Sequence, residues 1–177
     1  FTILTIFVLW FFRNPERVAP HDLSAVISPA DGKIIVTEEI NEDRYLKEKA
    51  LKISVFMNVF NVHVNRNPYG GKVKNVIYNK GRFISANLDK ASLDNEQNAV
   101  IVDIGSGKRI MFVQIAGLIA RRIVCYLKPG DTIEKGKRMG LIRFGSRVDV
   151  YLPAGSTLNV KIGDKVVAGE TILGYLK

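Results

Sequence analysis

The sequence predicts a mainly β fold of the α+β class, built as a sandwich or barrel of short strands. Glycine and proline separate short runs rich in valine and isoleucine along most of the chain, a pattern typical of β domains. Beyond the first residues, no long stretch has the helical period of about 3.6 residues. A Gly-Asp motif also occurs twice near the carboxy terminus, which indicates two like halves.

Short apolar runs bounded by turn residues are predicted as strands. They are Val26–Ile27, Lys33–Thr37, Leu51–Phe56, Gly71–Tyr78, Ala99–Ile104, Arg109–Ile115, Ile119–Leu127, Val148–Leu152 and Thr157–Ile162. The polar stretch Ser85–Asn98 is predicted as a loop with a short helix. Pro20–Asp22 and Asn41–Lys49 are predicted as surface connections.

The repeated motif lies in KPGDTIEKG at Lys128–Gly136 and in KIGDKVVAG at Lys161–Gly169. Each copy places a Gly-Asp turn before an apolar residue and a second glycine, and another apolar strand follows. A hairpin repeated in this way predicts a pseudo-symmetric β-sandwich. Lipoyl and biotinyl carrier domains have similar hairpins, so a non-enzymatic carrier or interaction domain is an alternative. A carrier domain is much shorter, however, and needs an exposed lysine at a hairpin tip.

The composition is that of one globular domain. The 177 residues are 47% hydrophobic, which is enough for a sizeable core. The single cysteine, Cys125, excludes an internal disulfide. With only two histidines, His21 and His63, the chain cannot build a zinc cluster of the usual Cys/His kind, and we expect no metal.

Positive charge is concentrated in residues 121–147. The whole chain carries a formal charge of +9, and this segment holds eight basic residues against Asp131 and Glu134. Such a segment favours a polyanion, either nucleic acid or an anionic membrane, although a solvated basic face is an alternative. A nucleic-acid binder would interleave aromatic and basic residues, and only Tyr126 and Phe144 are aromatic here. The candidate phosphate or membrane contacts are Arg121, Arg122, Arg143 and Arg147.

The amino-terminal run Phe1–Phe12 is nearly all apolar, and Arg13 and Arg17 follow it. A bilayer-spanning helix needs about 20 residues. Because the sequence begins with Phe1 rather than Met, the run can be the end of a longer span, or it can lie in the membrane interface. We expect residues 1–17 to be a truncated membrane-associated segment, with burial in the core as the alternative.

The segment GLIRFGSRVDVYLP at Gly140–Pro153 contains a Gly-Ser pair between two apolar runs. Glycine leaves its carbonyl carbon unshielded and tolerates strained backbone angles. The hydroxyl of Ser146 could therefore attack the carbonyl of Gly145 and shift the acyl group from nitrogen to oxygen. The ester can undergo β-elimination to dehydroalanine, which hydrolyses to a pyruvoyl group and ammonia. Most Gly-Ser pairs are ordinary turns, so this one needs a base and an oxyanion donor.

Two residues can support such chemistry. His63 lies in a β-like stretch in which Asn61, His63 and Asn65 alternate onto one face. Asp31 lies in a Pro-Ala-Asp-Gly turn and could orient a histidine, as in a catalytic triad. The alternatives are a hydrogen-bonded structural histidine and a turn carboxylate that binds its own backbone.

Six segments resemble the short form of the phosphatidylserine decarboxylase family, in the expected order over nearly the whole chain. They are FFRNPER (Phe11–Arg17), SPADGKI (Ser28–Ile34), NVHVNRNP (Asn61–Pro68), LDKASLDNEQN (Leu88–Asn98), QIAGLIARRIV (Gln114–Val124) and FGSRVDVYLP (Phe144–Pro153).

The resemblance implies that the chain is a proenzyme. Family members cleave themselves at the Gly-Ser bond, which here would divide a catalytic domain of residues 18–177 after Gly145. The products would be a β chain of residues 1–145 and an α chain of residues 146–177. In the family an Asp–His–Ser triad drives cleavage, and the matching positions are Asp31, His63 and Ser146. Ser146 would become a pyruvoyl cofactor.

The resemblance also implies the reaction of a pyruvoyl-dependent lyase. The cofactor forms a Schiff base with the serine headgroup, and loss of CO2 gives phosphatidylethanolamine. The implied partners are phosphatidylserine, an anionic membrane surface and the protein's own two chains, at the cytoplasmic face of the cell membrane. Another serine-headgroup lipid, such as archaetidylserine, would undergo the same chemistry and stays an alternative. The sequence leaves the oligomeric state open, and a homo-oligomer is compatible with it.

The sequence departs from the long bacterial form of the family at one position. That form has a second histidine three residues before the first, and Phe60 stands there in this chain. A proton-donor role of that second histidine is therefore unfilled. His63, a water or a backbone group would have to serve.

Overall fold

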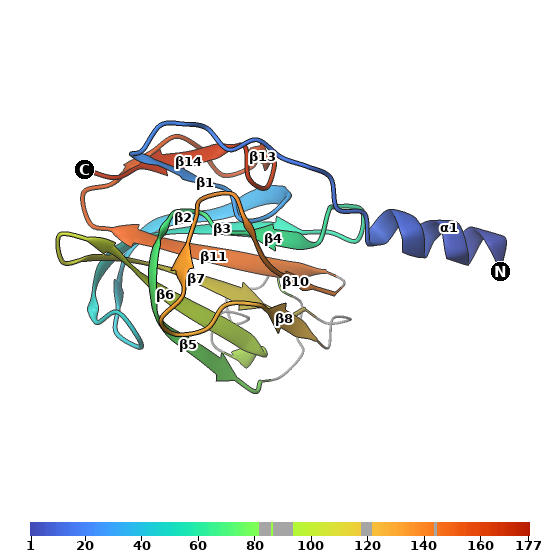
Figure 1. The fold of residues 1–177 in the computed structure, drawn as a ribbon, viewed down its shortest axis with the longest axis horizontal. Coiled ribbons are helices and arrows are strands. Elements are labelled where there is room, and N and C mark those ends of the chain that lie inside the picture. The colour runs from blue at the N-terminus through green and yellow to red at the C-terminus, as the bar shows by residue number, and fades with distance from the viewer. Residues whose placement is uncertain (82–85, 87–93, 118–121, 144) are drawn as a thin grey trace.

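The computed structural model describes residues 1–81, 86, 94–117, 122–143 and 145–177. Helix α1 (Thr2–Phe11) projects from one end of a body made of β-strands (Figure 1). Its residues are almost all apolar, and most of them are exposed. Within the described residues, no helix is both long enough and apolar enough to cross a bilayer.

Among the described residues, eight strands form one curled antiparallel sheet. Their spatial order is β13 (Lys165–Val166), β2 (Gly32–Glu42), β3 (Glu48–Met57), β11 (Ser146–Pro153), β7 (Lys108–Ile115), β6 (Gln97–Gly105), β5 (Gly71–Asn79) and β9 (Thr132–Ile133). Strand β11 therefore lies in the middle of the sheet, between β3 and β7. These strands contain most of the predicted Val- and Ile-rich runs, so the mainly β prediction is confirmed.

Two smaller antiparallel sheets complete the described body. One has the order β1 (Ala25–Ile27), β14 (Ile172–Tyr175) and β12 (Thr157–Leu158). The other has the order β4 (Val64–Arg66), β10 (Arg138–Ile142) and β8 (Ile123–Cys125). The predicted strand Ile119–Leu127 begins outside the described residues, and of its described residues 122–127 only Ile123–Cys125 form a strand, β8.

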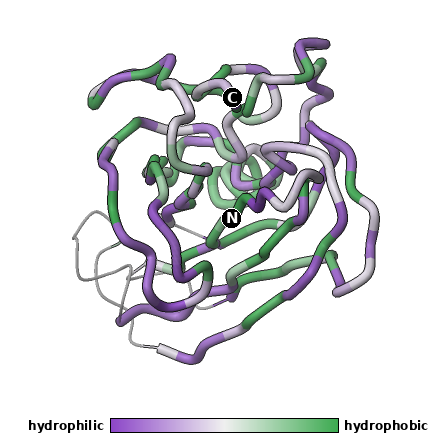
Figure 2. Tube along the Cα trace, turned by 90° about the vertical axis from the view of Figure 1, so that its left-hand side faces the viewer, coloured by the Kyte–Doolittle hydropathy of each residue, from purple (hydrophilic) through white to green (hydrophobic). Residues whose placement is uncertain are grey.

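The main core lies between the large sheet and the two small ones. Alternate residues of β11, Val148 and Val150, point into it, where they meet Leu173 of β14 and Ile142 of β10 in one apolar cluster. The opposite face of the large sheet carries a second, smaller cluster around Tyr151. Viewed along the long axis, the hydrophobic stretches lie mostly toward the middle and the hydrophilic stretches mostly around the outside (Figure 2). This layering confirms the predicted sandwich.

The sequence repeat forms two copies of one turn. Asp131 accepts a hydrogen bond from the Lys128 N–H at 2.8 Å, and Asp164 accepts one from the Lys161 N–H at 2.9 Å. The turns lead into β9 and β13, which pair with β5 and β2 at opposite edges of the large sheet. The predicted pseudo-symmetry is confirmed.

The two halves related by this symmetry differ in how the chain forms them: one is continuous and the other is interrupted. The half containing β4 to β10 is continuous, and its β6 and β7 form a hairpin. The other half contains β1 to β3 and β11 to β14, so the continuous half is inserted between β3 and β11. Each half supplies four strands of the large sheet and one small sheet. Strands β11 and β7 meet in the middle.

Candidate active site

Ser146 is the first residue of the central strand β11 and is fully buried. It pairs with Met57 of β3, and its hydroxyl donates a hydrogen bond to the Met57 sulfur at 3.4 Å. The preceding Gly145 has φ of 53°, a left-handed conformation that favours glycine. The Gly-Ser pair therefore lies inside the molecule at a bend of the backbone.

Two other Gly-Ser pairs share the left-handed glycine but differ in surroundings. Gly105 and Gly155 have φ of 91° and 86°, and each precedes a serine. Ser106 is exposed, and the half-buried Ser156 donates its hydroxyl hydrogen bond to the Pro153 carbonyl. Burial at the end of a central strand thus distinguishes Ser146 from these turn serines.

The carbonyl of Gly145 packs directly against the backbone of Gly117. A Cβ atom at Gly117 would lie 1.7 Å from the Gly145 oxygen, far inside van der Waals contact. The contact follows from strand register, because Arg147 pairs with Ile115 and the two chains continue side by side to residues 145 and 117. Only glycine leaves room for this carbonyl.

His63 directly precedes β4, and its carbonyl accepts a hydrogen bond from the Ile142 N–H at 3.3 Å. Its imidazole is 2% exposed and stacks on the ring of Phe11 with 4.2 Å between centroids. The Nδ1 atom lies 2.9 Å from the Asn61 carbonyl, which assigns the hydrogen to Nδ1. Within the described residues, Nε2 has no hydrogen-bond partner.

The environment of His63 keeps its side chain neutral. Burial lowers the pKa of the imidazole from 6.5 to about 4, and the nearby Arg13 charge adds to this, against the opposing effect of the Asn61 hydrogen bond. At neutral pH the buried Nε2 therefore offers a lone pair. A group of this kind can accept a proton.

Asp31 makes contacts other than those of a triad. Its carboxylate accepts a hydrogen bond from the Ala168 N–H at 2.8 Å and forms an ion pair with Arg17 at 3.2 Å. Among the described residues, no hydrogen bond joins Asp31 to His63, or His63 to Ser146. The backbone bond to Ile142 nevertheless places His63 beside the strand that leads to Gly145.

Comparison with known proteins places this chain in a family. A family model described as phosphatidylserine decarboxylase matches residues 4–174. The chain belongs to the phosphatidylserine decarboxylase family. A relative from Desulfotalea psychrophila, named phosphatidylserine decarboxylase proenzyme, is 58% identical over 99% of this chain and 82% of its own length. Relatives with the same name from Syntrophus aciditrophicus and Nitrosomonas europaea are each 54% identical, over 96% and 98% of this chain and 80% of their own lengths. The resemblance found in the sequence is confirmed.

The four candidate arginines of this phosphatidylserine decarboxylase family member have different surroundings. Arg122 and Arg143 are exposed, and the Arg143 N–H donates to the Arg122 carbonyl at 3.4 Å. Arg121 lies outside the described residues. Arg147 is fully buried, where its guanidinium binds the Asp149 carboxylate and donates to the Ser54 hydroxyl at 2.9 Å. Its burial corrects the expectation of a phosphate or membrane contact, because β11 turns Arg147 and Asp149 onto the same covered face.

Sequence reasoning missed several residues that the structure brings to this site. Gly117 was part of a matching segment, but its role depends on strand register. Phe11 was part of the apolar run and of a matching segment, but its contact with His63 was not predicted; it is 1% exposed and covers that imidazole. The buried amide of Gln114 lies on a strand that was predicted only for its apolar residues, and Asn98 was predicted in the loop Ser85–Asn98, whereas β6 begins at Gln97. The described residues contain no group of three or more His, Cys, Asp or Glu side chains that could hold a metal ion.

Proposed function

We propose that this chain is a phosphatidylserine decarboxylase that becomes active by breaking its own Gly145–Ser146 bond. The observation that carries the proposal is a buried serine whose preceding carbonyl is held in a left-handed bend against Gly117. The proenzyme names of the relatives support processing of this kind.

In the proposed cleavage, Ser146 Oγ attacks the Gly145 carbonyl carbon, and its proton passes to Nε2 of His63. The new C–O bond replaces the Gly145–Ser146 C–N bond, so the acyl group moves from nitrogen to oxygen. Loss of the Ser146 α-proton then expels the Gly145 carboxylate and leaves dehydroalanine, which water converts to a pyruvoyl group and ammonia. The neutral imidazole and the fixed carbonyl support the first step.

Asp31 enters this proposal through the family resemblance. Its carboxylate holds the turn at Ala168 and the side chain of Arg17. We therefore propose that Asp31 supports cleavage by ordering this turn.

The surroundings of Ser146 fit a pyruvoyl group. The site is buried, and the nearby Asn65 side chain offers its N–H donor to a sulfur atom rather than to oxygen. A group with two carbonyl oxygens would complement this donor. Once formed, the pyruvoyl group supplies the electron sink for loss of CO2. The chain itself would keep water away from the group and hold its orientation through β11.

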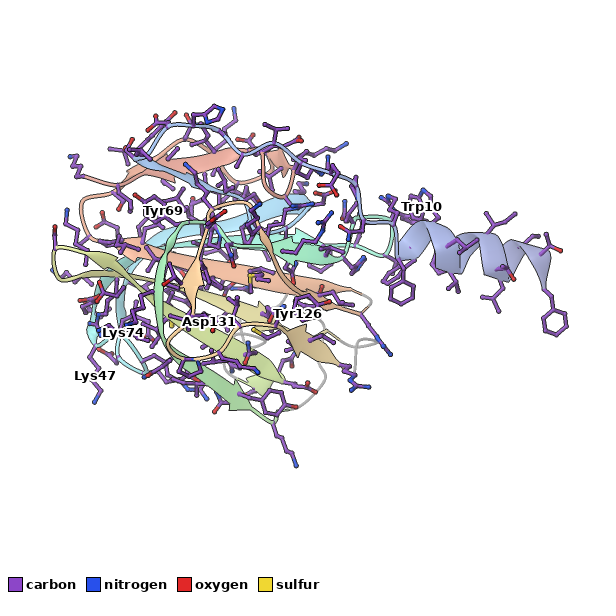
Figure 3. The ribbon with its side chains drawn as sticks, in the orientation of Figure 1. Trp10, Lys47, Tyr69, Lys74, Tyr126 and Asp131 are labelled. Carbon is purple, nitrogen blue, oxygen red and sulfur yellow. The ribbon has the colours of Figure 1, made fainter. Side chains whose placement is uncertain are left out.

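We propose that residues 1–17 attach the protein to an anionic membrane and present the site to lipid at the cytoplasmic face. Exposed apolar side chains on α1 support this. Trp10 lies at the base of the helix (Figure 3), and the Arg13 guanidinium lies over its ring, 3.8 Å from the centroid. Arg122 and Arg143 are candidate contacts for the lipid phosphate. Another serine-headgroup lipid is the second candidate substrate, because the reacting headgroup would be the same.

A denaturing mass spectrum of the purified protein tests the proposal. The wild type should give fragments that break between residues 145 and 146, with a ketone-reactive amino terminus on the smaller one. Ser146→Ala should remain one chain, whereas Ser156→Ala, in the matched Gly-Ser turn, should be cleaved normally. His63→Ala should be cleaved more slowly. Vesicles of phosphatidylserine and of archaetidylserine then distinguish the two substrates by CO2 release. An active wild type that stays uncut would refute the proposal.

A further inference from the structure

We propose that Asn65 donates a hydrogen bond to the pyruvoyl group formed from Ser146, and that Gln114 and Asn98 orient it for this purpose. The inference rests on the proposed self-cleavage. It assigns a role in the mature enzyme to a group of side chains that the cleavage mechanism does not use.

Three amide side chains form a buried chain that ends beside Ser146. Asn65 and Gln114 are 0% exposed, and Asn98 is 3% exposed. Asn98 Nδ2 donates to Gln114 Oε1 at 3.4 Å, and Gln114 Nε2 donates to Asn65 Oδ1 at 3.0 Å. They come from three separate elements: β4, β7 and β6.

A backbone carbonyl fixes the direction of this chain. Gln114 Nε2 also lies 3.4 Å from the Val124 carbonyl oxygen, which can only accept a hydrogen bond. The nitrogen of the Gln114 amide must therefore face Val124 and Asn65, so the atom of Asn65 that meets it must be the oxygen. Consequently the Asn65 nitrogen points the other way, toward Met57 and the start of β11.

That nitrogen has only a weak acceptor among the described residues. Asn65 Nδ2 lies 3.7 Å from the Met57 sulfur, the same atom that accepts the Ser146 hydroxyl at 3.4 Å. A thioether is a poor hydrogen-bond acceptor, and a buried amide donor without an oxygen acceptor is unfavourable. Two donors thus share one sulfur in a closed site.

Cleavage would correct this imbalance. Ser146 loses its hydroxyl and its N–H when it becomes a pyruvoyl group, and the group carries two carbonyl oxygens that only accept. The donor of Asn65 would then have an oxygen partner. A hydrogen bond to the ketone oxygen withdraws electron density from the ketone carbon, which makes that carbon more open to attack by the amine of the serine headgroup. Asn65 is therefore assigned to Schiff-base formation in the mature enzyme rather than to self-cleavage.

The test compares Asn65→Leu with Asn67→Leu. Leucine keeps much of the volume of asparagine but donates no hydrogen bond. Asn67 is a matched control, because it is also buried and donates its Nδ2 to the Glu134 carbonyl at 3.0 Å instead. Each protein is labelled with ¹³C-serine, its cleavage is measured by mass spectrometry, and the ketone stretching band is located by infrared difference spectroscopy.

Asn65→Leu should be cleaved as the wild type is, with its ketone band at higher frequency and its rate of CO2 release about 10- to 100-fold lower. Asn67→Leu should leave the band in place. Gln114→Met should shift the band in the same direction, and it serves as the test if Asn65→Leu does not fold. A cleaved Asn65→Leu protein with an unchanged band would refute the inference, as would a folded variant that is not cleaved. A wild type that is not cleaved would instead refute the proposed function.

Discussion

His63 is the residue whose chemistry depends most on its neighbours. The aromatic ring of Phe11 covers one side of the imidazole, and burial removes it from water. Because the charged form loses its hydration there, the pKa falls to about 4. His63 therefore stays neutral at a pH at which an ordinary histidine would begin to take up a proton.

This lowered pKa predicts a pH-dependent stability. The unfolded chain binds a proton at His63 near pH 6.5, whereas the folded chain resists it until about pH 4. The contribution to stability is thus present above pH 6.5 and is lost as the pH falls toward 4, by up to about 3 kcal/mol. Urea unfolding between pH 7 and 4, in a Ser146→Ala background that stays uncut, should show a smaller loss for His63→Phe. Equal losses would contradict the lowered pKa.

Gly117 provides a second test at the residue scale. Gly117→Ala should slow self-cleavage by about 100-fold, because the added Cβ would displace the carbonyl that Ser146 attacks in the proposed cleavage. Gly174→Ala is the matched control: its Cβ would meet the Thr157 carbonyl at 2.4 Å, in a sheet away from Gly145. Both the processing rate and the melting temperature should be measured. If both variants fold and are processed at the same rate, cleavage does not depend on the contact between the Gly145 carbonyl and Gly117.

The sequence indicated the proposed cleavage bond more directly than the contacts around it. Gly145 and Ser146 are neighbours in the chain, so their chemistry could be inferred locally. The approach of Gly117 depends on the register of β7 against β11, and no local pattern encodes it. The ion pair of Arg147 with Asp149 could have been anticipated, since the two residues are two apart in a strand and must share a face.

Among the elements, the longer strands of the large sheet followed their sequence pattern, and its two shortest strands did not. Strands β9 and β13 have only two residues each. They form because they pair with β5 and β2, rather than because of local strand propensity. The expected surface connection Asn41–Lys49 is shorter, because β2 continues to Glu42 and β3 begins at Glu48. The Glu42 carboxylate binds the backbone N–H of Tyr45 and of Leu46, which closes a tight turn.

Helix α1 predicts membrane binding that can be separated from the fold. Ile3, Leu4 and Leu9 are 85%, 63% and 71% exposed, and changing all three to serine should leave the Phe11 contact intact. Sedimentation with anionic vesicles should show binding weakened by at least about 10-fold, because less apolar surface can enter the lipid.

The control changes three exposed apolar residues outside α1, namely Val18, Leu23 and Ile162, to serine. This variant should bind vesicles as the wild type does. Equal weakening in both variants would show that α1 has no special part in attachment.

At the scale of the whole molecule, the proposed cut would not separate the two chains. The piece 146–177 contains β11, which pairs with β3 on one side and β7 on the other, and also β13 and β14, which pair with β2 and β1. Its apolar residues, such as Val148 and Leu173, belong to the common core. Removing this piece would expose the core of both halves.

Cleaved protein should therefore elute in size exclusion as one species, at the volume of the uncut Ser146→Ala protein. The two chains should separate only at urea concentrations that unfold the molecule. Loss of the small chain on simple dilution or dialysis would contradict the described strand order.

The nesting of one half inside the other gives the proposed cleavage point a topological meaning. In the uninterrupted half the strands β6 and β7 are joined by a tight hairpin, but their symmetry mates β3 and β11 are joined only through the whole inserted half. The bond between residues 145 and 146 lies between the last strand of the inserted half, β10, and β11 of the other half. Cutting this bond breaks the long connection between β3 and β11 and leaves every hairpin intact. The molecule can therefore gain a new chain end at its centre while every strand keeps its neighbours.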